Sequence, residues 1–338
     1  MTASEGTIRL PSGMTTGIGP LPHYDPGDAI EFVLRHTPAL PAVPALPARS
    51  RREGMIPQAA MGISGIDVAD DGRLDIRHED LDPEAPVVVD FSSQAHVGLR
   101  AFLTAVADRD GPIKLSVTGP VTLGLTLYVT GVDADLAFRI AGRAVRQRAR
   151  ALARYVQERV PQAELVVFVD EPALSHLTDR GFPVAPSDGI DLVSSTLAAV
   201  EPLAITGVHC CGPADWRLVL GAGPRMLSLP VGAGAVAHAG SIGDFLDRGG
   251  WLVWGAVPTD GPVGTTADRL WRRLSDELFE LSDGGCDPGR LRSNAMVTPV
   301  CGLARHGSTQ AEHVMALTSV VAQRLHGQAI GLRLSVGA

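Results

Sequence analysis

Short apolar runs alternate with longer amphipathic segments along most of the chain. The runs are rich in β-branched residues and predict strands at 113–117, 165–169, 204–208, 226–229, 251–254 and 294–298, preceded by strands at 15–18 and within 56–61 or 87–91. The longer segments show the 3.6-residue spacing of helices and predict them at 95–106, 136–160, 189–200, 241–247, 266–281 and 310–325. The chain is therefore predicted to repeat a strand–helix unit.

The predicted strands are continuously apolar, which is typical of a parallel sheet covered by helices on both faces. About eight strand–helix units fit a (β/α)8 TIM barrel better than an open, doubly wound sheet. No Gly-x-Gly-x-x-Gly motif opens a helix after the first strand, so the usual signal of a dinucleotide-binding sheet is missing. We expect one barrel domain over residues 1–338, with the proline-rich segment 36–57 forming a long N-terminal loop and not a linker between domains.

Composition narrows the range of partners. The net charge of −8 argues against a broad nucleic-acid or membrane-surface footprint. No run approaches the roughly 18 continuous apolar residues of a membrane span, and the N-terminus does not read as a secretory signal. We therefore expect a cytoplasmic protein without nucleic-acid or membrane partners, whose four cysteines stay reduced.

Polar side chains follow four of the predicted strands where each strand ends. They are Asp170 after 165–169, His209 after 204–208, Asp260 shortly after 251–254, and Cys301 after 294–298. In a TIM barrel the carboxyl ends of the strands carry the active site. We therefore expect these four side chains to converge on one rim.

The stretch GVHCCG contains a histidine followed by two cysteines. His209 and Cys211 are two residues apart and point to the same side of an extended strand end, whereas Cys210 points to the other side and is expected to pack in the core. Together with Cys301 they provide one imidazole and two thiolates, a three-ligand zinc set with a fourth position open for substrate. The alternative is that Cys301 is simply a buried cysteine. Cys286 lies in a predicted turn and receives no role.

Zinc held by two thiolates is electron-rich and a poor source of hydroxide. It can still bind an incoming thiol, lower the pKa of that thiol and hold it as a reactive thiolate at neutral pH. The site therefore predicts thiol activation for attack on an electrophilic carbon.

Five short motifs occur in a fixed order along nearly the whole chain. They are TTGIG at 15–19, TGPVT at 118–122, VDEPAL at 169–174, VHCCG at 208–212 and TPVCGL at 298–303. Together they resemble the catalytic, C-terminal barrel of cobalamin-independent methionine synthases, within the superfamily that includes uroporphyrinogen decarboxylases and methylcobalamin:coenzyme M methyltransferases. The resemblance implies a (β/α)8 barrel with zinc on His209, Cys211 and Cys301. It also implies that Asp170 holds the amino group of the substrate, although an aspartate at a strand–helix turn is also a common helix cap.

The sequence departs from the family at three positions. Pro230 stands where the family's glutamate ligand to zinc is expected, Pro20 replaces the serine that holds the amino-acid carboxylate, and Asp260 takes the place of the catalytic histidine. These departures argue against homocysteine as the substrate. The hypothesis that remains is zinc-dependent transfer of a methyl group to another small-molecule thiol. In this hypothesis Asp260 accepts or donates protons at the rim.

Chain length bears on the methyl donor. Long members of the family carry a second, N-terminal barrel that helps to bind folate, and the 338 residues here match only the catalytic half. By resemblance to short members, the donor is expected to be a methylated corrinoid such as methylcobalamin, carried by a corrinoid protein. Two alternatives stay open, namely a metal-free decarboxylase or lyase on the same barrel, and a non-catalytic barrel that binds zinc or a corrinoid.

Overall fold

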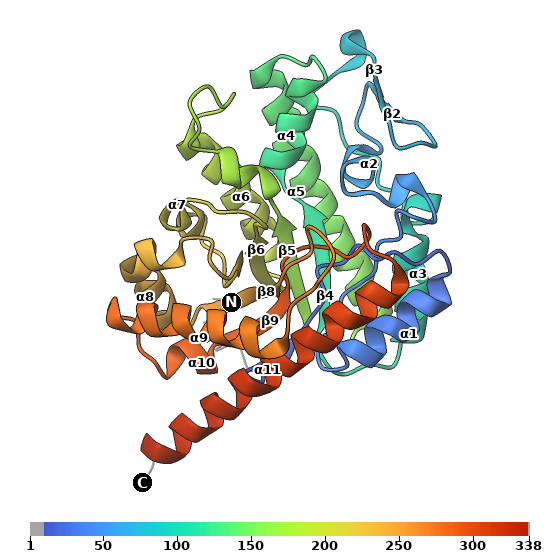
Figure 1. The fold of residues 1–338 in the computed structure, drawn as a ribbon. Coiled ribbons are helices and arrows are strands. Elements are labelled where there is room, and N and C mark those ends of the chain that lie inside the picture. Colours follow the sequence, from blue (N-terminus) through green and yellow to red (C-terminus); the bar gives the residue numbers. More distant parts are fainter. Residues whose placement is uncertain (1–9, 337–338) are drawn as a thin grey trace.

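A curled sheet of seven parallel strands forms the centre of the molecule (Figure 1). The computed structural model describes residues 10–336, and the side chains up to residue 331. Neighbouring strands follow the order β1-β9-β8-β7-β6-β5-β4. Their bounds are β1 (Met14–Thr15), β4 (Ile113–Thr118), β5 (Leu165–Asp170), β6 (Ile205–His209), β7 (Met226–Pro230), β8 (Trp251–Val257) and β9 (Ala295–Pro299). The predicted parallel α/β architecture is confirmed, and the curled sheet is TIM-barrel-like.

The space between the two edge strands, β1 and β4, is bridged by an irregular segment, residues 41–45, which we call the bridging segment. Ala42 forms an isolated parallel bridge with Lys114 of β4, and Ala45 forms one with Pro20, which follows β1. The amide of Val43 donates to the carbonyl of Lys114 at 2.9 Å. The segment therefore contacts both edges of the sheet without being a strand itself.

The sequence predicted a complete eight-stranded barrel, but the described residues form seven strands in this sheet. Neither place proposed for an early strand contains one, because 56–61 falls mostly in helix α2 (Met55–Ala60) and 87–91 is irregular. Prolines recur at every third position from Pro38 to Pro47. Proline has no amide hydrogen, so this segment cannot form a regular ladder with β1 or β4.

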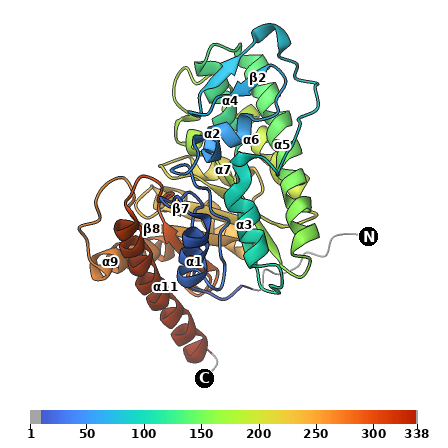
Figure 2. The same ribbon diagram turned by 90° about the vertical axis from the view of Figure 1, so that its right-hand side faces the viewer.

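Helices surround the sheet, and each of the six predicted ones is present to within a few residues at its start. They are α3 (Val97–Ala105), α5 (Ala134–Arg159), α6 (Pro186–Val200), α8 (Ala239–Asp247), α9 (Ala267–Asp283) and α11 (Ser308–Val336). Besides α2, four more helices in the described residues were not predicted, namely α1 (Pro26–His36), α4 (Pro120–Val129), α7 (Trp216–Gly221) and α10 (Arg290–Ser293). α11 continues well past the predicted end and projects from the body of the molecule in Figures 1 and 2. Within residues 10–336, no helix combines the length and apolarity that crossing a membrane requires.

A small hairpin departs from the repeating pattern. Strands β2 (Ile66–Val68) and β3 (Leu74–Ile76) pair antiparallel and lie beside α2 and α4 at the top of Figure 2. Their apolar side chains pack on a cluster formed by α2, α4 and α5. The hairpin thus extends the helical layer outside β4.

The inside of the curled sheet is filled by its own apolar cluster, separate from the larger one between sheet and helices. Phe168, Met226 and Trp251 are among its buried members. The ring of Phe168 covers Gly207, where an added Cβ would lie only 2.6 Å from a ring carbon. This packing closes the interior, and the polar residues described below lie towards the carboxyl ends of the strands.

A buried carboxylate, Glu171, joins β5 to the start of α4. It accepts hydrogen bonds from the amides of Val121 (2.7 Å) and Thr122 (2.8 Å) and from the Thr122 hydroxyl (2.6 Å). Burial raises the pKa of Glu171 to about 7, and these hydrogen bonds act against that rise. Because Gly119, the N-cap residue of α4, offers no side chain, Glu171 satisfies the free amides of the first turn.

Gly119→Ala tests this junction, because an added Cβ would lie 2.1 Å from the Glu171 carboxyl carbon. We expect the free energy of unfolding in urea to fall by about 1–3 kcal/mol, the usual cost of overpacking. Gly240→Ala is the matched control, since that exposed helical glycine has nothing within 4 Å of its Cβ position and should be neutral or slightly stabilising. Equal stability of Gly119→Ala and wild type would contradict the proposed junction.

Candidate metal centre

The register of the sheet places polar residues side by side across four strands. Thr118 of β4 pairs with Asp170 of β5, Asp170 with His209 of β6, and His209 with Ser228 of β7. Residues aligned in this way face the same side of a parallel sheet. The side chains of His209 and Ser228 meet accordingly, with Nδ1 2.9 Å from Oγ.

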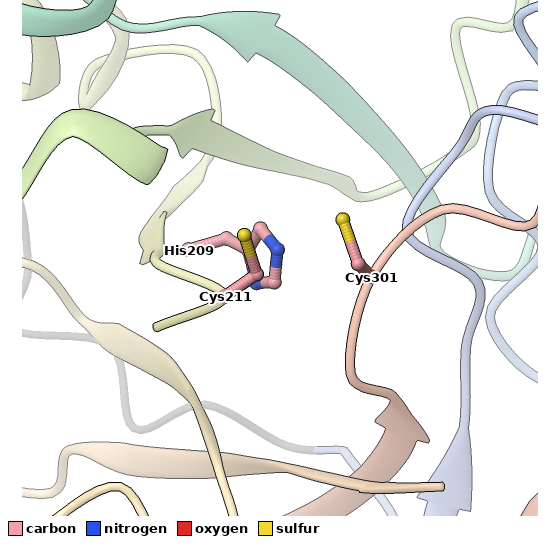
Figure 3. A group of neighbouring side chains, drawn as sticks. All are labelled: His209, Cys211 and Cys301. Carbon is pink, nitrogen blue, oxygen red and sulfur yellow. The ribbon is translucent and has the colours of Figure 1, made fainter. Parts of the chain in front are cut away.

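His209, Cys211 and Cys301 come together at the open end of the sheet, two from the end of β6 and one from the loop after β9 (Figure 3). Their potential ligand atoms all lie within 4.8 Å of one another. Nε2 of His209 is buried and has no hydrogen-bond partner. In the tautomer in which Nδ1 donates to the Ser228 hydroxyl, Nε2 carries a free lone pair. One nitrogen and two sulfur donors form a set that fits zinc.

The two thiols of this set interact with each other. The hydrogen bond between them lowers the pKa of Cys211 and raises the pKa of Cys301 to about 12, and burial adds to the second effect. Without a metal, Cys301 therefore keeps its proton at neutral pH. A divalent cation would displace that proton, because it stabilises both thiolates.

The neighbouring cysteine, Cys210, faces the opposite way. It is fully buried in the large apolar cluster, with its sulfur 3.5 Å from the Ser175 hydroxyl. This confirms the prediction that the double cysteine splits into one residue at the site and one in the core. Cys286 is also buried and donates to the carbonyl of Ala239.

Asp170 is half-buried beside the group of His209, Cys211 and Cys301. Burial raises the pKa of its carboxyl, and the charges of His209 and Lys114 act against that rise. One carboxyl oxygen, Oδ1, is buried without a hydrogen-bond partner, and the adjacent short helix (Pro172–His176) receives no side-chain cap. Asp170 therefore has a free hydrogen-bond acceptor, Oδ1. It does not cap the adjacent helix, which was the alternative role.

Lys114 lies behind Asp170, although no sequence motif pointed to it. The lysine is almost fully buried, and Nζ donates to the carbonyl of Ile18 and to the Ser116 hydroxyl, both at 2.9 Å. Burial lowers the pKa of Lys114 to about 8, and Asp170 opposes the shift. A buried cation therefore faces the Asp170 carboxylate across Ser116.

A cavity of about 640 Å³ opens onto this group. All four residues predicted at the rim line it, together with Cys211: Asp170, His209, Asp260 and Cys301. Asp260 is exposed to solvent, whereas His209 is buried. Pro20 lines the cavity as well, and Pro230 is the buried last residue of β7. Neither proline, at the two positions where the sequence departs from the family pattern, provides a side chain that could bind a metal or donate a hydrogen bond.

Comparison with solved structures supports the fold. A B12-independent methionine synthase from Shewanella sp. W3-18-1, solved in complex with selenomethionine, is similar over 95% of this chain and 99% of that chain, with a TM-score of 0.63 and 15% sequence identity. A putative vitamin-B12-independent methionine synthase from Listeria monocytogenes is similar over 72% of this chain and 71% of that chain, with a TM-score of 0.47 and 16% identity. The sequence matches no protein-family model and no curated protein. At such low identity the first likeness shows a shared fold.

Metal binding tests the three-residue group directly. We expect the purified protein to bind one zinc ion, and cobalt substitution to give the thiolate-to-metal absorption of a two-sulfur site. Cys211→Ser, Cys301→Ser and His209→Ala should each lower the zinc content sharply. Cys210→Ala is the matched control and should retain full zinc content. Zinc binding that is unchanged in all three site variants would exclude this metal centre.

Ser228→Ala tests the orientation of the imidazole. Removing the hydroxyl leaves Nδ1 without its partner, so the ring loses its fixed tautomer. We expect zinc affinity to fall by about 10-fold, within the range for partners of metal-ligating histidines. A competition titration with a chelator measures this, and an unchanged affinity would show that Ser228 does not orient His209.

Proposed function

We propose that this protein is a zinc-dependent methyltransferase that methylates a small-molecule thiol. The observation that carries the proposal is the donor set of His209, Cys211 and Cys301 at the open end of the curled sheet, in a fold similar to that of a methionine synthase. These residues supply three ligands, so a fourth position stays free for the acceptor. A bound zinc ion would supply Lewis acidity that keeps the acceptor thiol deprotonated at neutral pH.

The chain's own residues position the acceptor. Ser228 fixes the imidazole of His209, so the free Nε2 points towards the cysteines. Asp170 offers its unpartnered buried oxygen to an N–H donor of the acceptor, such as an ammonium group. Lys114 and Ser116 hold that carboxylate from behind. In the transfer itself, a sulfur–carbon bond forms while the methyl group leaves its donor atom, which keeps the electron pair.

The proposal also covers the role of Asp260 and the identity of the methyl donor. Asp260 lies at the exposed side of the cavity, where we propose that it exchanges protons with solvent as the acceptor thiol enters. We propose a methylated corrinoid as donor, supplied as methylcobalamin or on a corrinoid protein. We place the protein in the cytoplasm, because free cysteines that bind metal have to stay reduced.

Homocysteine is not the acceptor that we propose. A methionine-synthase-like site that accepts an amino acid needs a group for its carboxylate, and Pro20 at this part of the cavity has neither a hydroxyl nor an amide hydrogen to offer. The acceptor is therefore a different thiol with an N–H group for Asp170.

A methyl-transfer assay tests the function. Zinc-loaded protein is mixed with methylcobalamin and a panel of thiols, with and without amino groups, and thioether formation is followed by mass spectrometry. We expect turnover with at least one thiol, and a loss of about 100-fold or more in Cys301→Ser, as for removal of a group that acts in the transition state. Cys210→Ala should keep the wild-type rate.

Asp170→Asn separates the binding role from the metal. We expect it to raise KM for an amino thiol by about 10-fold or more, because a charged hydrogen bond is lost, and to leave KM for a thiol without an amino group unchanged. Zinc content should stay at the wild-type level. Zinc binding without turnover of any thiol would favour the non-catalytic barrel, and a metal-free protein would favour the decarboxylase alternative.

A further inference from the structure

The cavity continues from the metal centre to the outer face of β4. Successive side chains of a strand face opposite sides, and the cavity is lined from one face by Ser116 and Thr118 and from the other by Leu115 and Val117. β4 is an edge strand of the seven-stranded sheet, next to the bridging segment. The cavity therefore passes around this edge into a second space, which we call the outer arm.

The outer arm has apolar walls and a basic end. Its apolar lining residues are Phe91, Leu99, Leu115, Val117 and Leu152. Arg148 from α5 and His96 from the turn before α3 are among the basic side chains that line the cavity, and we assign these two to the outer arm. Both are more than nine-tenths buried, at 7% and 6% exposure.

Arg148 has no counterion in the part of the chain that the structure describes. Its Nη2 donates to the carbonyl of Met61, and its Nε is buried without an acceptor. Burial lowers the pKa of Arg148 to about 10, and no carboxylate acts against that shift. The guanidinium is therefore still charged at neutral pH. A buried charge without a partner is costly, and a bound anion would offset that cost.

His96 adds a second polar group beside the guanidinium. Its Nδ1 lies 3.2 Å from the Ser93 hydroxyl, and its ring packs edge-on against Phe91. Burial and the charges of Arg148 and Arg100 lower the pKa of His96 to about 4, while the exposed Asp90 acts weakly in the other direction. The surroundings of His96 are therefore electropositive, as an anion site requires.

We propose that Arg148 and His96 form an anion subsite in the outer arm, which binds an acidic group of the thiol acceptor while the sulfur lies at the metal centre. The planar guanidinium suits a carboxylate or a similar oxyanion, and the apolar walls suit a hydrocarbon chain that joins the two ends of the molecule. The assignment of this acidic group to the acceptor rests on the proposed methyl transfer. The anion subsite itself does not.

Binding to the metal-free protein tests the subsite alone. Hexanoate and hexanol are titrated in parallel by calorimetry, because they share a chain and differ in charge. We expect hexanoate to bind at least about 10-fold more tightly to the wild type, the effect of one hydrogen bond to a charged group. Arg148→Gln should abolish this preference, since it removes the charge and keeps an N–H donor for the Met61 carbonyl. Arg150→Gln, exposed on the same helix, should preserve it.

Two outcomes would overturn the subsite. One is an equal affinity of the wild type for hexanoate and hexanol, and the other is a preference for hexanoate that survives in Arg148→Gln. If that variant does not fold, the wild type still decides the question by NMR. Hexanoate should shift the ring-proton resonances of His96, assigned with His96→Asn, and hexanol should not. The absence of a selective shift would also overturn the proposal.

Turnover then tests the link to the acceptor. In the methyl-transfer assay, Arg148→Gln should raise KM for 6-mercaptohexanoate by about 10-fold and leave KM for 6-mercaptohexanol unchanged. An equal KM change for both thiols would overturn the assignment of the anion to the acceptor. If no thiol is methylated while hexanoate binding still depends on Arg148, the proposed function fails and the anion subsite stands.

Discussion

The metal-competent group depends on the register of three neighbouring strands. Asp170, His209 and Ser228 lie in one row because β5, β6 and β7 pair without a bulge. A slip of one residue in any of these strands would turn its side chain to the opposite face. The hydrogen bonding between β5 and β6 continues beyond the last residue pair, Asp170 and His209, because the amide of Glu171 donates to the carbonyl of His209 at 2.7 Å. The backbone thus secures the row at the position where the chemistry is proposed.

Buried polar groups also lie beside this row. Lys114 lies over the ring of Phe168, 5.0 Å from its centre, and shares Ser116 with Asp170. A buried lysine and a buried carboxylate are each costly alone, and each lowers the cost of the other. Glu171 avoids the same problem through three hydrogen bonds to α4. Lys114, Asp170 and Glu171 are therefore tolerated because each has a polar or oppositely charged neighbour.

Sequence patterns predicted the repeating part of the fold and the site residues that end strands. Apolar runs located β4 to β9, and the two-residue spacing of His209 and Cys211 placed them on one side because strand geometry is local. The same patterns missed Lys114, Ser228 and Arg148. Their roles depend on register and on packing between distant segments, which no local spacing encodes. The described residues show a TIM-barrel-like sheet and not the complete eight-stranded barrel for a related reason, since counting units gave no weight to the missing amide hydrogens of the proline-rich segment.

The bridging segment has a consequence for how such a protein can change. In a closed barrel, the number and tilt of the strands fix the size of the interior. Here one part of the wall is a loop held by a few backbone bonds, including those of Val43 and Ala45. Loops accept insertions and substitutions more readily than strands do. Val43, Pro44 and Ala45 line the cavity, whereas the proposed metal ligands come from other stretches of the chain, so the shape of the cavity can diverge while the proposed ligands are retained.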